Sequence, residues 1–129
     1  MKLLDTCYLI DLLRGDPEAI LRSKDLDGAA TSAVNLYELI FRVHFGSRNR
    51  KRRMEEAETL LSRLEILPFD GDSARLAARL MSDLTCEGKP VDSLDGFTAA
   101  VGLSHGCSIV VTRNTKHYDM IQGIQTKTY

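Results

Sequence analysis

The stretch that decides the fold is Ser108-Ile109-Val110-Val111-Thr112, a continuous β-branched run flanked by Gly106 and Asn114. Such a run predicts a buried strand, because β-branched side chains suit a pleated surface that is covered on both faces. Working outward, further short strands are expected over Lys2 to Leu4, Ala29 to Thr31, Ile66 to Phe69 and, at one edge, Ile124 to Thr126.

Helical patterns fill the intervals between these strands. Ser32 is a good N-cap, and Gly46 with Ser47 would break the helix that it opens. Other helices are expected from Leu9 to Leu13, near Pro17, from Arg50 to Leu64, from Asp72 or Ser73 to Gly88, and from Asp92 to His105. Strands that alternate with helices in this way predict an α/β fold with a mainly parallel sheet.

Length and composition bound the class of protein. A chain of 129 residues, 43% hydrophobic and 27% charged, is typical of one globular domain, expected here over residues 1–129. No apolar run approaches a membrane span, and the acid at Asp5 leaves no room for a signal peptide. Three cysteines without a Cys-x-x-Cys pair indicate a reducing compartment, so a cytoplasmic protein without membrane contact is expected.

The charge is distributed unevenly. The net charge is −1, yet one segment carries six basic residues and no acid: Arg42, Arg48, Arg50, Lys51, Arg52 and Arg53. The remainder of the chain is therefore acidic. A body of one sign with a segment of the other indicates a charged partner, such as an RNA backbone, although a solvated helix start is the simpler interpretation.

Polar residues fall where the strands are expected to end. Asp5 follows the first strand, Asn114 follows the strongest one, and Glu38 and Asp95 lie in helices beside the sheet. The carboxyl ends of parallel strands form the usual ligand site of an α/β sheet. Several oxygen ligands without Cys or His predict a hard divalent cation, Mg²⁺ or Mn²⁺.

Each of these residues also has a purely structural interpretation. Asp5 could cap the following helix, Glu38 could pair with Arg42, and Asn114 could be a turn residue. Asp92 is expected to be an N-cap, with Asp95 as its capping-box partner. The joint arrangement, rather than any single residue, favours a functional site.

Four segments, taken together, resemble a known family. They are residues 3–15 (Leu-Leu-Asp-Thr-Cys-Tyr-Leu-Ile-Asp-Leu-Leu-Arg-Gly), 31–39, 95–100 and 110–118. In this order they are similar to the PIN-domain nucleases, especially the VapC-type ribonuclease toxins of toxin–antitoxin pairs. The resemblance covers essentially the whole chain.

The resemblance implies a three-layer α/β/α sandwich and a Mg²⁺- or Mn²⁺-dependent endoribonuclease that acts on RNA. It also implies a cognate antitoxin and a homodimer. Carried over by residue, it assigns the catalytic positions to Asp5, Glu38, Asp95 and Asn114, the metal to Asp5 and Asp95, and the pocket lining to Thr6 and Thr112. Asn114 departs from the pattern, because many members of the family have an acid at this position. With Asn instead, the site carries one negative charge fewer. The basic residues Arg48, Arg50, Lys51, Arg52 and Arg53 are expected to bind RNA or the antitoxin.

Other classes of protein fit less well. His44, His105 and His117 lack metal-ligand spacing, and the first strand is not followed by a dinucleotide-binding glycine pattern. The alternative that stays open is a PIN-like module that binds RNA or protein without cleaving it.

Overall fold

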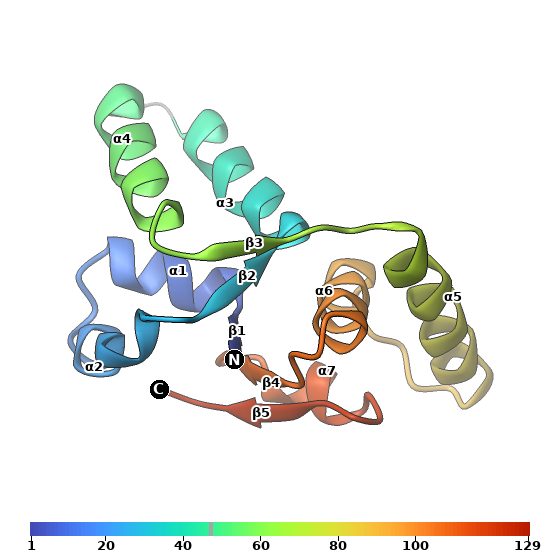
Figure 1. Ribbon diagram of the computed structural model, residues 1–129. Helices are drawn as coiled ribbons and strands as arrows, with labels where there is room; N and C mark the ends of the chain where they lie inside the picture. The colour runs from blue at the N-terminus through green and yellow to red at the C-terminus, as the bar shows by residue number, and fades with distance from the viewer. Residues whose placement is uncertain (47) are drawn as a thin grey trace.

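Five short strands form one parallel sheet in the computed structural model, which describes residues 1–46 and 48–129 (Figure 1). The order across the sheet is β3-β2-β1-β4-β5. The strands are β1 (Lys2–Leu4), β2 (Ala30–Ser32), β3 (Glu65–Leu67), β4 (Ile109–Val111) and β5 (Gln125–Lys127).

The first strand lies at the centre of the sheet. Leu3 in β1 is in register with Ala30 of β2 on one side and with Val110 of β4 on the other. The chain therefore winds away from β1 in both directions, and the carboxyl ends of β1 and β4 form the switch point where α/β sheets bind ligands. Asp5 and Thr112 are the first residues after these two strands.

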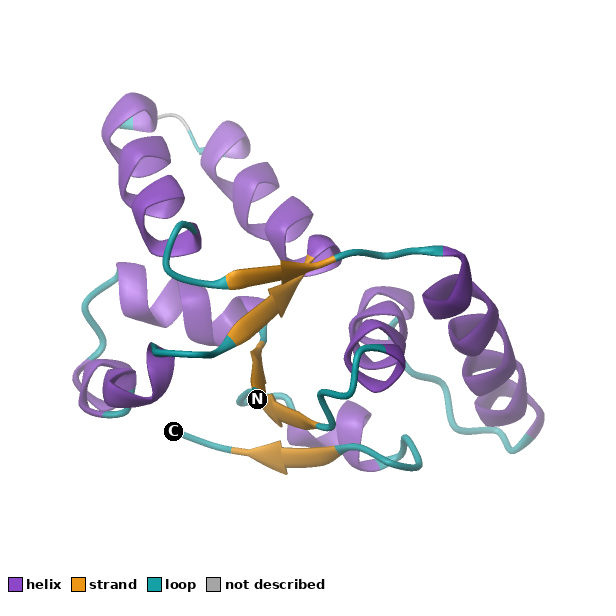
Figure 2. Cartoon of the chain, viewed as in Figure 1, coloured by secondary structure: helices purple, strands orange, loops and turns teal. Residues whose placement is uncertain are grey.

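Helices cover both faces of the sheet (Figure 2). They are α1 (Thr6–Leu13), α2 (Pro17–Leu21), α3 (Ala33–Phe45), α4 (Arg50–Leu61), α5 (Gly71–Cys86), α6 (Ser93–Ser104) and α7 (Thr115–Asp119), with a 3₁₀ turn at Ser23–Leu26. None of the helices in the described ranges is long and apolar enough to cross a membrane.

Two separate cores show that the fold has three layers. Leu4 and Val111 face α1, α3 and α4, while their neighbours Leu3 and Val110 face α5, α6 and α7. Successive strand residues point to opposite faces, so the central strands β1 and β4 each contribute to both cores. The expected α/β/α sandwich with a parallel sheet is confirmed.

Local departures from the sequence expectations have simple causes. Helix α5 is capped by Asp70 rather than by Asp72 or Ser73, since the Asp70 carboxylate accepts from the Ser73 amide at 2.9 Å. Strand β3 stops before Pro68, which cannot donate to a ladder. The helix break is seen at Gly46, and Ser47 lies outside the described residues. Helix α7 was not anticipated.

Candidate active site

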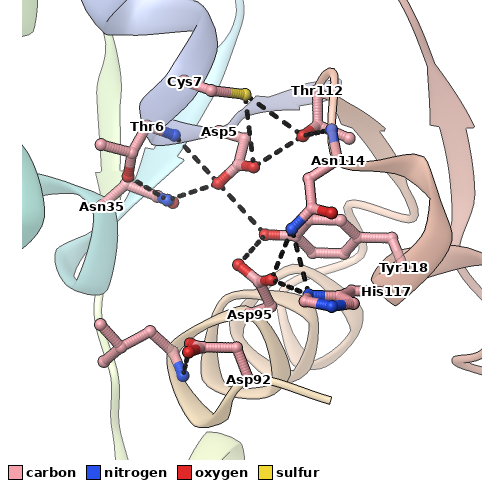
Figure 3. Close-up of polar contacts among 11 residues, drawn as sticks. Asp5, Thr6, Cys7, Asn35, Asp92, Asp95, Thr112, Asn114, His117 and Tyr118 are labelled. Atoms are coloured by element: carbon pink, nitrogen blue, oxygen red, sulfur yellow. Dashed lines mark hydrogen bonds and ion pairs between the residues drawn. The ribbon is translucent and has the colours of Figure 1, made fainter.

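The carboxylate of Asp5 is buried at the end of β1, where it is the N-cap of α1 (Figure 3). Its Oδ1 accepts from the backbone N–H of Thr6 at 2.9 Å, the side-chain Nδ2 of Asn35 at 3.0 Å and the hydroxyl of Tyr118 at 3.1 Å. Its Oδ2 accepts from the Thr112 hydroxyl at 2.7 Å. Donors from α1, α3, α7 and the end of β4 thus fix both carboxylate oxygens.

Helix α3 brings Glu38 to the same place. The helix begins with a capping box. The backbone N–H of Asn35 donates to Ser32 Oγ at 3.0 Å, and the side-chain Oδ1 of Asn35 accepts from the backbone N–H of Ser32 at 3.2 Å. Asn35 Nδ2 donates onward to Thr6 Oγ1 at 2.9 Å, and Thr6 Oγ1 donates to Glu38 Oε1 at 2.9 Å. One buried amide therefore links Asp5 with the helix that carries Glu38.

Asp95 enters from the first turn of α6. Its Oδ2 accepts from Asn114 Nδ2 at 2.9 Å and lies 2.7 Å from His117 Nδ1. Its Oδ1 lies 3.4 Å from the Tyr118 hydroxyl. That same hydroxyl donates to Asp5, so a single phenolic oxygen stands between the two carboxylates, as Figure 3 shows.

The site accumulates negative charge. Burial raises the pKa of Asp95, and the charge of Asp5 adds to the effect, while the hydrogen bond from His117 opposes it. Burial likewise raises the pKa of Glu38, with the charges of Asp5 and Asp95 adding to it against the Thr6 hydrogen bond. Partly buried carboxylates whose pKa is raised by neighbouring negative charge are a favourable environment for a cation.

A cavity of about 280 Å³ opens onto these groups. Its lining comprises Asp5, Thr6, Cys7, Ile10, Asp11, Arg14, Glu38, Arg42, Asp95 and Asn114. Within residues 1–46 and 48–129, no three His, Cys, Asp or Glu side chains lie close enough together to form a complete metal cage. The oxygen donors present instead fit a cation that keeps much of its water, as Mg²⁺ does on one or two carboxylates.

The structure brings together the residues singled out from sequence. Asp5, Thr6, Glu38, Asp95 and Asn114 line one cavity, and Thr112 contacts Asp5 from beneath it. Asp92 is the exposed N-cap of α6, as expected, and it does not line the cavity. Two structural interpretations are wrong. Asp95 contacts Asn114 and His117 rather than completing a capping box, and Glu38 forms no ion pair with Arg42 in the described part of the chain.

Three contributors escaped the sequence analysis: Asn35, His117 and Tyr118. His117 was set aside for want of metal-ligand spacing, yet it contacts a carboxylate rather than a metal. The three-residue spacing of Asn114 and His117 is the signal that could have found it, because it places both side chains on one face of a helical turn. Tyr118 is fully buried and is indistinguishable in sequence from an ordinary core residue.

The basic segment lies at the start of α4, and its residues from Arg48 to Arg53 are not among those that line the carboxylate cavity. Arg48, Arg50, Lys51, Arg52 and Arg53 are exposed. Asn49, the N-cap, makes no side-chain capping bond, and no acid lies in the first turn of the helix. Arg52 pairs with Glu56 at 3.1 Å, one turn further along.

Comparisons with known proteins agree with this geometry. The model of the PIN domain family matches residues 2–121. The chain is 30% identical to the tRNA(fMet)-specific endonuclease VapC of Salmonella typhimurium, over 98% of this chain and 96% of the relative. It is 32% identical to Toxin FitB of Neisseria gonorrhoeae, over 89% and 88% of the two chains. The crystal structure of DNA-bound VapBC from Salmonella typhimurium superposes with a TM-score of 0.88 at 30% identity, covering 99% of this chain and 98% of the other.

Proposed function

The chain belongs to the PIN-domain family, and on that basis we propose that it is the ribonuclease toxin of a toxin–antitoxin pair that cleaves RNA with Mg²⁺ or Mn²⁺. The observation that carries the proposal is the shared cavity of Asp5, Glu38 and Asp95 at the switch point of the sheet. We take residues 1–129 as one nuclease domain.

Asp5 and Asp95 are the residues that would hold the metal, because their carboxylates flank one hydroxyl at the floor of the site. A divalent cation supplies Lewis-acid polarisation of a phosphate oxygen and lowers the pKa of water. Asn114 and His117 orient Asp95, as outer hydrogen-bond partners of metal-binding carboxylates commonly do.

Glu38 is suited to accept the proton of the attacking water. Its Oε1 accepts from Thr6, its side chain lines the cavity, and its raised pKa makes it a better base than an exposed glutamate. The water oxygen attacks phosphorus in line, and the bond to the 3′ oxygen breaks. The 3′ oxygen leaves with the electron pair and takes up a proton, so the products are a 5′-phosphate and a 3′-hydroxyl. No protein nucleophile is required.

A protein partner is supported by an exposed aromatic stripe on α3. Tyr37, Phe41 and Phe45 are 58%, 51% and 81% exposed, and their rings follow one another at centroid distances of 6.0 and 5.9 Å. Contiguous exposed apolar surface of this kind marks interaction sites. Since a solved relative from Mycobacterium tuberculosis, 29% identical to this chain, is described as a member of the VapBC family of toxin–antitoxin systems, we assign the stripe to an antitoxin, and we expect a cytoplasmic homodimer.

The test is cleavage by the Asp95→Asn variant. We expect Mn²⁺-dependent cleavage of single-stranded RNA by the unaltered protein and no cleavage by the variant, because the change keeps the shape and removes the charge. Asp92→Asn is the matched control: it alters an exposed acid one turn away and should cleave normally. Circular dichroism checks that both variants fold.

Activity that survives excess EDTA would overturn the metal-dependent mechanism. Equal inertness of the unaltered protein and Asp95→Asn on every RNA tried, with both proteins folded and free of antitoxin, would instead favour a module that binds without cleaving.

A further inference from the structure

Two arginines stand at the rim of the acidic cavity. Arg14 is the C-cap residue of α1, and Arg42 lies near the end of α3. Both side chains are exposed, and both line the cavity together with Asp5, Glu38 and Asp95. Positive groups so close to a carboxylate cluster would ordinarily neutralise it by pairing.

Neither arginine does so. Across the part of the chain that the structure describes, Arg14 and Arg42 form no side-chain hydrogen bond or ion pair. Acids close to them in sequence are engaged elsewhere. Asp16, two residues after Arg14, pairs with Arg113 at 3.2 Å. Asp11 accepts from the Tyr129 hydroxyl and pairs with Arg113 at 3.4 Å, while Glu38 accepts from Thr6. The guanidinium donors of both arginines are therefore left for a ligand.

The two arginines also occupy the junction of two cavities. A second cavity, of about 800 Å³, runs between α1, α3 and the start of α4, where Arg53 lines it. It shares Ile10, Arg14, Glu38 and Arg42 with the carboxylate cavity. A strand that crosses the carboxylates and enters this groove must pass both guanidinium groups. The groove is also lined by the stripe of Tyr37, Phe41 and Phe45, so RNA in the groove and an antitoxin on the stripe would exclude one another.

We propose that Arg14 and Arg42 are positioning residues that bind the phosphates adjacent to the scissile phosphate of an RNA strand. This inference rests on the proposed nuclease function. Arginine presents a planar fork that matches phosphate oxygens with two hydrogen bonds. RNA carries one phosphate for every nucleotide, so a strand whose scissile phosphate lies at the carboxylates places its neighbouring phosphates along the adjoining groove.

The charge pattern favours RNA over an acidic protein segment at this place. The carboxylates and the arginines share one cavity, so a ligand here must tolerate both. A phosphodiester could contact both the arginines and a cation held by the carboxylates, whereas the carboxylates of an acidic peptide would add to the negative charge of Asp5, Glu38 and Asp95.

The experiment measures RNA binding by Arg14→Ala, Arg42→Ala and the double variant. Fluorescence anisotropy with a short labelled single-stranded RNA is recorded in EDTA, where the strand is bound but not cut. We expect about tenfold weaker binding for each single variant at low salt, as expected when a charged hydrogen bond is removed. The slope of log K against log[salt] should fall by roughly 0.7 for each phosphate that is no longer neutralised.

Arg79→Ala is the matched control, because it removes one exposed arginine on α5 and should change neither affinity nor slope beyond the general charge effect. Arg42→Lys should recover part of the affinity, since it restores the charge but not the fork. In Mn²⁺, KM should rise in the alanine variants while the Mn²⁺-induced shift in melting temperature stays as in the unaltered protein.

RNA affinity and salt slope equal to those of Arg79→Ala would overturn the proposal. Unchanged RNA binding with loss of binding to an oligoglutamate peptide would also overturn it and assign the arginines to an acidic protein partner. If the unaltered protein binds RNA through these arginines but cleaves none in Mn²⁺, the phosphate contacts stand and the proposed nuclease function fails.

Discussion

At the scale of single residues, the hydroxyl of Tyr118 governs the spacing of the two metal-binding candidates. It has one proton, which it donates to Asp5 at 3.1 Å while Asp95 lies 3.4 Å away. Burial, reinforced by the charges of Asp5 and Asp95, raises the pKa of Tyr118 well above its ordinary value. The hydroxyl therefore keeps its proton and remains a donor at neutral pH.

Tyr118→Phe is expected to weaken Mn²⁺ binding by about tenfold or more, the usual cost of removing an outer hydrogen-bond partner of a metal ligand. RNA cleavage should fall at low Mn²⁺ and recover when Mn²⁺ is raised, because the hydroxyl orients a ligand and takes no part in the reaction. Calorimetric Mn²⁺ titration and the Mn²⁺ dependence of cleavage measure the two effects.

Tyr37→Phe provides the comparison, since Tyr37 is an exposed tyrosine on α3 that makes no contact with the carboxylates in the described part of the chain. Equal Mn²⁺ affinities for the two phenylalanine variants would contradict the role given to Tyr118.

At the scale of elements, the side chain of Asn35 connects the N-terminus of α3 to the site by hydrogen bonds. This amide is fully buried and bonds to Ser32 on one side and to Asp5 and Thr6 on the other. Asn35→Ala should lower the free energy of unfolding by about 2–3 kcal/mol, because it leaves buried partners unsatisfied. Urea unfolding in EDTA measures this cost without any contribution from bound metal.

Asn49 caps α4 and offers a matched comparison. Its side chain makes no capping bond and its φ is 52°, a left-handed conformation that glycine adopts readily. Asn49→Gly should change the unfolding free energy by no more than a few tenths of a kcal/mol. A similar decrease in both variants would mean that the Asn35 network contributes nothing beyond a generic cap.

A second prediction at this scale concerns RNA binding by the basic residues at the start of α4. Positive charges in the first turn interact unfavourably with the helix dipole. A bound polyanion would offset this unfavourable electrostatic energy of the arginines at the start of α4. Replacing Arg50, Arg52 and Arg53 by Glu should weaken RNA binding more than tenfold at low salt and lower the salt slope by roughly 0.7 for each phosphate that the segment no longer neutralises. Anisotropy titrations over a salt series measure both.

A charge-matched triple variant, with Glu at Arg63, Arg75 and Arg79, distinguishes direct binding from net charge. Those arginines are exposed and lie away from the start of α4. If the two triple variants bind RNA equally, the segment at the start of α4 does not contact RNA, and the antitoxin or solvent is left as its partner.

At the scale of the whole molecule, the ionised carboxylate of Asp95 disfavours folding when no metal is bound. The raised pKa of Asp95 means that the folded protein holds its proton more tightly than the unfolded chain, whose pKa is near 3.8. Protonation therefore favours folding, and this contribution disappears as pH rises through the folded pKa. In EDTA, Asp95→Asn should melt at a higher temperature than the unaltered protein at pH 7, and the difference should shrink toward pH 4.

Mn²⁺ should reverse that order, since a ligand of the folded state alone stabilises it by RT ln(1 + [Mn²⁺]/Kd), about 2.7 kcal/mol at a hundredfold excess over Kd. Thermal scans in EDTA and in Mn²⁺ at several pH values measure the whole pattern. A lower melting temperature for Asp95→Asn in EDTA at pH 7 would show that the hydrogen bonds to Asp95 outweigh the repulsion.

Sequence alone was sufficient for the sheet and for the acids at its edge. Strand β4 is evident from its β-branched run. Because strands alternate with helices, the sheet is parallel, and an acid directly after a strand, such as Asp5, then lies at the carboxyl edge of the sheet. The rest could not be predicted in this way. Helix α7 spans five residues, too few for a periodic pattern, and Tyr118 reaches Asp5 across 113 positions of sequence.

The central place of β1 has a consequence for how the protein is made. On a translating ribosome, Asp5 emerges well before the neighbouring strand β4 and before its donors Thr112 and Tyr118, which follow it by 107 and 113 residues. Contacts of such long sequence separation form late in folding. A nascent or truncated chain that stops before Thr112 therefore has Asp5 without the hydrogen-bond donors that hold its carboxylate, and the site can form only after Thr112 and Tyr118 have left the ribosome.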